Sequence, residues 1–302
     1  MQQFLRQWQF KHMAFIGDDF KRARREWLYP AAVMQSPWRA VPLSIFLFVL
    51  SAVLQLLAGF LAYSVMRGEF SDNSISNNLG RFSFGFPSDQ DLFTKASIIG
   101  LFPAAILILA IAVYFSRFGL PKMAGRLTLQ IPKLGWLGWI IIVVGFGVSM
   151  SLVFAGTMAA LGIDPETYSP SGGGVTGDNS SAGIVEKTMA ALAKDPVLFA
   201  FALPSVVLAA PLTEELLFRG ALFSAIASSR LGRVGAVLIT AALWALAHAT
   251  SAPWLFVGML FVMGICLGVL LLRFGSLWVT IACHASWNAM SSLALFGAGT
   301  QL

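Results

Sequence analysis

The sequence predicts an all-α polytopic membrane protein, a bundle of about seven or eight transmembrane helices. Of its 302 residues, 57% are hydrophobic and 11% are charged, and the mean hydropathy is +0.77. Apolar runs of about 20 residues recur, the length that crosses a hydrocarbon core roughly 30 Å thick. A soluble fold could not cover this much apolar surface, so the membrane class is favoured over any soluble class.

Seven apolar runs follow one another along the chain. Five are long enough to span by themselves: 42–66, 97–116, 136–161, 254–272 and 277–296. The run at 234–249 is shorter but almost uncharged, whereas 197–228 would form about 48 Å of helix, too long for one upright span. Pro204 and Pro211 could break this last run, and the sequence alone does not decide whether they do.

The positions of the charges predict how the chain is oriented. Residues 1–40 carry seven Lys and Arg against three acids, and 117–135 carry four against none. The loops at 67–96 and 162–196 instead carry three against four and two against five. This alternation is the positive-inside pattern, so we expect a cytoplasmic N-terminus and an integral, multi-pass protein of the plasma (inner) membrane. The basic excess indicates topology and contact with anionic lipid, and no nucleic acid is expected as a partner.

The sequence predicts one membrane domain preceded by a short N-terminal segment. Residues 1–40 mix aromatic and basic side chains without a long apolar run, which predicts an amphipathic segment at the cytoplasmic interface. Residues 41–302 then form a single membrane domain. Within it, the Gly- and Ser-rich stretch at 169–183 predicts a mobile external loop.

The stretch "PLTEELLFRG" (211–220) places charges inside an apolar run. Each Glu or Arg at the centre of a membrane helix costs about 2.5–3.5 kcal/mol on insertion scales, so an isolated charge there is unfavourable. Glu215 and Arg219 stand at i and i+4 with the acid first, the favourable order for a helical ion pair. Glu214 has no such partner in its own helix and is left available. If the cluster lay at a helix end, its groups would reach water and only mark topology; both depths are open at this point.

Two of the three histidines also lie in apolar runs, His248 in "LWALAHAT" and His284 in "IACHASWNAM". Asn288 follows His284 by four residues and shares its helix face. A single membrane histidine is usually a packing residue, but two of them on the runs that follow the Glu-Glu run favour a site. A carboxylate, two imidazoles and an amide donor suit amide hydrolysis, since a carboxylate can take a proton from water and an amide can donate to an oxyanion.

The order EExxxR, aromatic-xxxH, HxxxN resembles the CPBP intramembrane protease family, which includes the CAAX proteases and the bacteriocin-processing or Abi proteins. The three motifs are "EELLFR", "WALAH" and "HASWN", and they extend over about 190–296. Trp244 stands where the family usually has Phe. Each motif alone is weak, whereas the three in order on successive membrane segments are specific.

The resemblance implies a role for each site residue. Glu214 would activate the attacking water with His248 as its partner, and His284 and Asn288 would stabilise the oxyanion. Glu215 and Arg219 would brace the site. No cofactor is certain: a possible Zn²⁺ would take His248, His284 and Glu214 as ligands. The chain has no HExxH motif, and the same residues serve a metal-free mechanism, which we favour.

The resulting hypothesis is an intramembrane endopeptidase acting on a membrane-associated peptide or protein, with a prenylated CAAX-type substrate as one option. The alternative is a catalytically silent membrane scaffold or bacteriocin-immunity-type protein with the same fold. A proton- or ion-coupled transporter is also compatible with buried carboxylates, but we find no inverted repeat to support it.

Overall fold

The computed structural model describes residues 16–29, 37–67, 89–114, 127–163, 192, 194–249 and 254–299. The external loop expected at 169–183 and the first 15 residues of the N-terminal segment lie outside these ranges. Within them every element is helical, in agreement with the predicted all-α class.

The helices, in chain order, are α2 (Asp18–Ala23), α3 (Pro37–Met66), α5 (Gln90–Tyr114), α7 (Gly135–Ala160), α9 (Pro196–Pro204), η3 (Ser205–Ala209), α10 (Ala210–Glu214), η4 (Glu215–Leu222), α11 (Phe223–Ala227), α12 (Gly232–Ala247), α13 (Trp254–Phe274) and α14 (Leu277–Gly299).

Each of the seven apolar runs forms a helix where the sequence predicted one. Five helical runs among the described residues are long and apolar enough to cross a membrane. The run from Pro196 to Ala227 is one of them, continuous over 32 residues and not broken at Pro204 or Pro211. Large apolar side chains on α3 and α7, such as Leu57 and Val148, are more than half exposed, as expected of surfaces that face lipid. The protein is therefore an integral multi-pass membrane protein.

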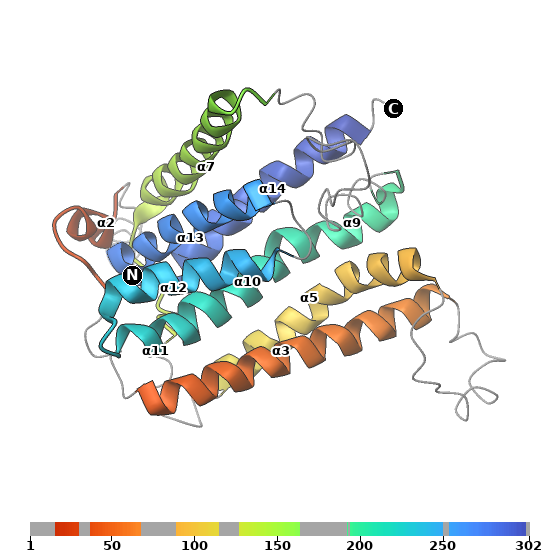
Figure 1. The fold of residues 1–302 in the computed structure, drawn as a ribbon, viewed down its shortest axis with the longest axis horizontal. Coiled ribbons are helices and arrows are strands. Elements are labelled where there is room, and N and C mark those ends of the chain that lie inside the picture. The colour runs from red at the N-terminus through yellow and green to blue at the C-terminus, as the bar shows by residue number, and fades with distance from the viewer. Residues whose placement is uncertain are drawn as a thin grey trace, which may run out of the picture.

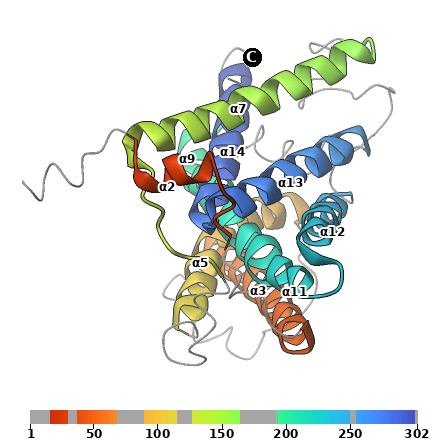
Figure 2. The same ribbon diagram turned by 90° about the vertical axis from the view of Figure 1, so that its left-hand side faces the viewer.

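The helices form three groups in space (Figure 1). The antiparallel pair α3 and α5 lies at one side, α7 lies at the other, and the helices from α9 to α14 fill the space between them. Figure 2 shows the same order after a quarter turn, with α7 projecting well beyond the rest. The run from α9 to α11 contacts α3, α5, α12 and α14, so it is the central element of the bundle.

A proline inside α5 leaves one backbone carbonyl without a helical donor, and a side chain from the central run supplies a donor. Pro103 inside α5 has no N–H for the carbonyl of Ile99, and the Ser205 hydroxyl donates to that carbonyl at 3.1 Å. This hydrogen bond is costly to lose in an apolar interior, so it fixes the central run against α5.

The turn between α13 and α14 is held by two distant segments. The N–H groups of Leu28 and Tyr29 donate to the carbonyls of Arg273 and Leu272, and the N–H of Leu277 donates to Thr128. Gly275 has φ +61°, and a Cβ there would lie 2.4 Å from the Leu28 carbonyl oxygen, so this position requires glycine. These hydrogen bonds set where α14 begins, and so they also set the position of His284.

Close contact between α12 and α13 depends on Gly264, which supports a prediction. A Cβ at Gly264 would lie 2.9 Å from Ala241 and 3.2 Å from Nη2 of Arg219. We expect Gly264→Ala to lower the free energy of unfolding by about 1–3 kcal/mol, because backbone and a buried guanidinium must shift. Gly258→Ala on the same helix is the matched control, since nothing lies within 4 Å of its Cβ position. It should be neutral or stabilise by up to about 1 kcal/mol through helix propensity. Unfolding of both variants in detergent micelles checks this, and equal stabilities would contradict it.

Candidate active site

The helical run that carries the charged cluster is well defined at its start. Asp195 is its N-cap, and its carboxylate accepts from the N–H groups of Val197 at 3.0 Å and Leu198 at 3.1 Å. Pro196 follows in the first turn, where its missing N–H costs nothing. This is a standard start signal, and it fixes where the run begins.

Two segments of this run are wound as π-helix, Ser205–Ala209 and Glu215–Leu222. Such widened turns are rare and occur often at functional sites. The second begins directly after Glu214, so the two adjacent glutamates lie on either side of the change in winding. Their surroundings differ accordingly.

Glu215 and Arg219 form a fully buried ion pair. Oε1 of Glu215 lies 3.0 Å from Nη1 of Arg219, and both side chains are 0% exposed. Nη2 of Arg219 donates to the carbonyl of Gly264 at 3.4 Å. The pairing expected from the i, i+4 spacing is thus present. It ties the central run to α13.

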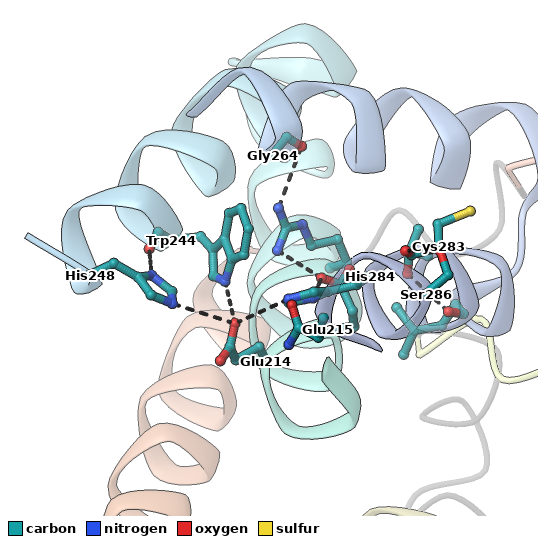
Figure 3. Close-up of polar contacts among 12 residues, drawn as sticks. Glu214, Glu215, Trp244, His248, Gly264, Cys283, His284 and Ser286 are labelled. Atoms are coloured by element: carbon teal, nitrogen blue, oxygen red, sulfur yellow. Dashed lines mark hydrogen bonds and ion pairs between the residues drawn. The ribbon is translucent and has the colours of Figure 1, made fainter. Parts of the chain in front are cut away.

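Glu214, in contrast, keeps 25% of its side chain exposed and faces three groups from other helices (Figure 3). The indole Nε1–H of Trp244 donates to its Oε2 at 2.5 Å. Nε2 of His248 and Nε2 of His284 each lie 3.9 Å from the same oxygen. The structure therefore brings together the carboxylate and both imidazoles that the sequence singled out. At 3.9 Å, neither imidazole is directly hydrogen-bonded to Glu214.

The Nδ1 atoms of both histidines are engaged, which assigns their tautomers. Nδ1 of His248 lies 2.8 Å from the carbonyl oxygen of Trp244, and Nδ1 of His284 lies 3.0 Å from Oε1 of Glu215. Both partners only accept hydrogen bonds, so Nδ1 carries the proton in each ring. In the neutral state, Nε2 of each histidine then presents a lone pair toward the Glu214 carboxylate.

Asn288 was expected to donate to an oxyanion, but the hydrogen bond that positions it in the structure is to backbone. Its Nδ2 donates to the backbone carbonyl of Val206 at 2.9 Å. The N–H of Ala210 bonds Ser205, and the next residue, Pro211, has no N–H, so Val206 lacks a donor within its own helix. The amide of Asn288 supplies that donor and joins α14 to η3. The structure thus ties one amide hydrogen of Asn288 to backbone.

Two residues of the site were not identified as functional from the sequence. Trp244 was taken only as the aromatic residue of a motif, although it lies one helical turn before His248 and a buried indole usually finds an acceptor for its N–H. Gly264 gave no signal at all, because its contact with Arg219 is between residues 45 apart in the chain.

The donor types around Glu214 are those that zinc accepts, namely two imidazole nitrogens and a carboxylate. Among the residues that the structure describes, however, no group of three His, Cys, Asp or Glu side chains is arranged to hold a metal ion. The described arrangement does not fit a three-ligand zinc site, so we derive no step through a metal.

Residues 196–290 match a family model described as "Type II CAAX prenyl endopeptidase Rce1-like". The match covers less than half of the chain, and it includes all three motifs. It confirms, over these residues, the resemblance to the CPBP family of intramembrane proteases. No curated protein and no solved structure matches the chain.

Proposed function

We propose that this chain is an intramembrane endopeptidase in which Glu214 activates water for attack on a peptide bond. The observation that carries the proposal is the convergence on Oε2 of Glu214. The indole N–H of Trp244 and the Nε2 atoms of His248, directly after α12, and of His284, on α14, all lie within 3.9 Å of this oxygen. The family match supports a CAAX-type endopeptidase in general. The roles of individual residues are our proposal.

In the first step, the carboxylate of Glu214 takes a proton from a water molecule as the oxygen of that water bonds to the carbonyl carbon of the substrate. His248, with its Nε2 lone pair facing the carboxylate, accepts a hydrogen bond from the same water and orients it. Glu214 is 25% exposed and can be reached from outside the helix bundle, whereas the neighbouring Glu215 is 0% exposed.

The negative charge that develops on the carbonyl oxygen is stabilised by His284 and the second amide hydrogen of Asn288. His284 can donate from Nε2 only as an imidazolium, because Nδ1 already donates to Glu215. The buried Glu215 carboxylate, 3.0 Å away, balances that charge. Collapse of the intermediate breaks the C–N bond, and Glu214 returns its proton to the leaving amine.

The test is cleavage by the full chain in lipid nanodiscs, offered a farnesylated CAAX peptide and, separately, an unprenylated peptide with a membrane anchor. Run in H₂¹⁸O, cleavage should place one ¹⁸O in the new carboxylate, and mass spectrometry of both products identifies the bond. Cleavage of one substrate only would define its class. Intact peptides in both cases would favour the silent scaffold or immunity-type alternative.

Removal of metal gives a separate prediction. Since our steps use only side chains of the protein, activity should stay within about twofold after dialysis against EDTA or treatment with 1,10-phenanthroline. Zinc measured by plasma mass spectrometry should be well below one per chain. Loss of activity that Zn²⁺ alone restores would contradict the metal-free steps and assign the ion to Glu214, His248 and His284.

A further inference from the structure

Trp244 is the largest of the fully buried side chains among the described residues, and it lies at the site. It is 1% exposed, lies on α12 one turn before His248, and gives its only hydrogen-bond donor to Oε2 of Glu214. An indole N–H donates but never accepts, and it does not ionise in the range where proteins work. Trp244 therefore takes no part in proton transfer, and its effect on Glu214 is through geometry.

The ring of Trp244 touches the other polar groups of the site (Figure 3). Its centroid lies 5.3 Å from that of His248 at an interplanar angle of 71°, and 5.2 Å from that of His284 at 80°. The guanidinium of Arg219 lies over its face, 4.6 Å from the centroid, as a cation–π contact. These contacts on several sides fix the plane of the indole and so the direction of its N–H.

Such a constraint makes this glutamate act as a base at a defined point. The terminal torsion of a Glu side chain is broad, so an unrestrained carboxylate presents either oxygen in a range of directions. The indole N–H removes this freedom, because it fixes Oε2 at the point that both imidazole Nε2 atoms face at 3.9 Å. Charged acceptors form the stronger class of hydrogen bonds, so this one can restrain the torsion.

We propose that Trp244 is a positioning residue, whose indole N–H holds the Glu214 carboxylate toward His248 and His284 while its ring spaces the two imidazoles. This inference rests on the proposed function, since it concerns the same carboxylate. The proposal assigns the restraint on Glu214 to the indole N–H and not to the bulk of the aromatic side chain. Phenylalanine fills part of the same volume without the bond.

The first arm of the test replaces Trp244 by Phe and, in a second variant, by 3-benzothienylalanine, which keeps the shape of indole but has no N–H. Both should lower kcat by about 10- to 100-fold with KM within about twofold, because a base displaced by an ångström loses this much. Trp278→Phe is the matched control: its Nε1–H donates to the Leu129 carbonyl at 2.9 Å, away from Glu214. It should leave kcat within twofold. A kcat for the benzothienyl variant within twofold of wild type would overturn the proposal.

The second arm does not depend on cleavage. The ¹⁵N-indole spectrum of the full chain in nanodiscs should contain a Trp244 cross-peak, assigned by its absence in Trp244→Phe. That peak should move upfield in Glu214→Gln, while the Trp278 peak stays in place. An unmoved Trp244 peak would overturn the proposed bond. If the peak moves but wild-type protein cleaves no peptide, the bond stands, and the proposed function, with the positioning role built on it, is overturned.

Discussion

Glu214→Gln should lower kcat by about 10²- to 10⁴-fold, the range that a general base contributes. Glutamine keeps the size and an acceptor oxygen of the side chain, so the hydrogen bond from Trp244 can persist in a weaker form, without a charged acceptor. It cannot take a proton from water. The fold should be retained, because Glu214 is partly exposed and lies outside the buried ion pair. Steady-state cleavage of the peptide that the wild type cuts measures the effect.

The control for this variant is Glu26→Gln, the same substitution at an exposed glutamate that pairs with Arg22 outside the long apolar helices. It should leave kcat and KM within about twofold, as expected of a surface ion pair. Thermal unfolding of both variants should match wild type within a few degrees. A wild-type kcat for Glu214→Gln would show that Glu214 is not the general base.

Glu215→Met should lower the free energy of unfolding by about 3–5 kcal/mol, the usual cost of removing one partner of a buried ion pair. The substitution leaves the Arg219 guanidinium, 0% exposed, without its carboxylate in an apolar interior. It also takes the acceptor from Nδ1 of His284. Stability and activity should therefore both fall. Denaturant titration in micelles measures the stability.

A second, exposed ion pair in the same chain separates the effect of burial on stability from the effect of pairing. Arg22→Met breaks an exposed ion pair with Glu26 whose N–O distance, 2.9 Å, is as short as that of the buried pair. It should cost at most about 1 kcal/mol. The double variant Glu215→Met/Arg219→Met should regain much of the stability lost in Glu215→Met, because no lone charge stays buried. Its activity should stay as low as that of Glu215→Met, because Nδ1 of His284 still lacks its acceptor. A double variant less stable than the single one would contradict this view of the pair.

Much of the fold followed from the sequence because membrane spans obey a simple length rule. All seven runs became helices, and the ion pair of Glu215 and Arg219 followed from i, i+4 spacing alone. The meeting of Glu214 with His248 and His284 was inferred from motif order, and it is present at 3.9 Å from each.

Other features depend on contacts between helices that spacing does not encode. Pro211 was read as a possible break, but the run stays continuous, because a π-helical turn and the amide of Asn288 accommodate the missing N–H. The bond from Trp244 to Glu214 joins residues 30 apart on two helices. Its direction is set by ring packing, which no one-dimensional pattern records.

The cytoplasmic N-terminus, the plasma-membrane location and the division into residues 1–40 and 41–302 stay predictions from charge and hydropathy. Accessibility labelling of single cysteines at each loop in intact cells would test the orientation. Labelling of the 117–135 loop from the outside would contradict it.

The central claim is that Glu214 and His248 act on one water molecule as a unit. A double-mutant cycle tests it most directly: kcat/KM is measured for wild type, Glu214→Gln, His248→Ala and the double variant in nanodiscs. Groups that act together are strongly non-additive. We predict a double variant within about threefold of the slower single variant. A loss equal to the product of the two single losses would show that the two groups act independently, and would contradict the mechanism.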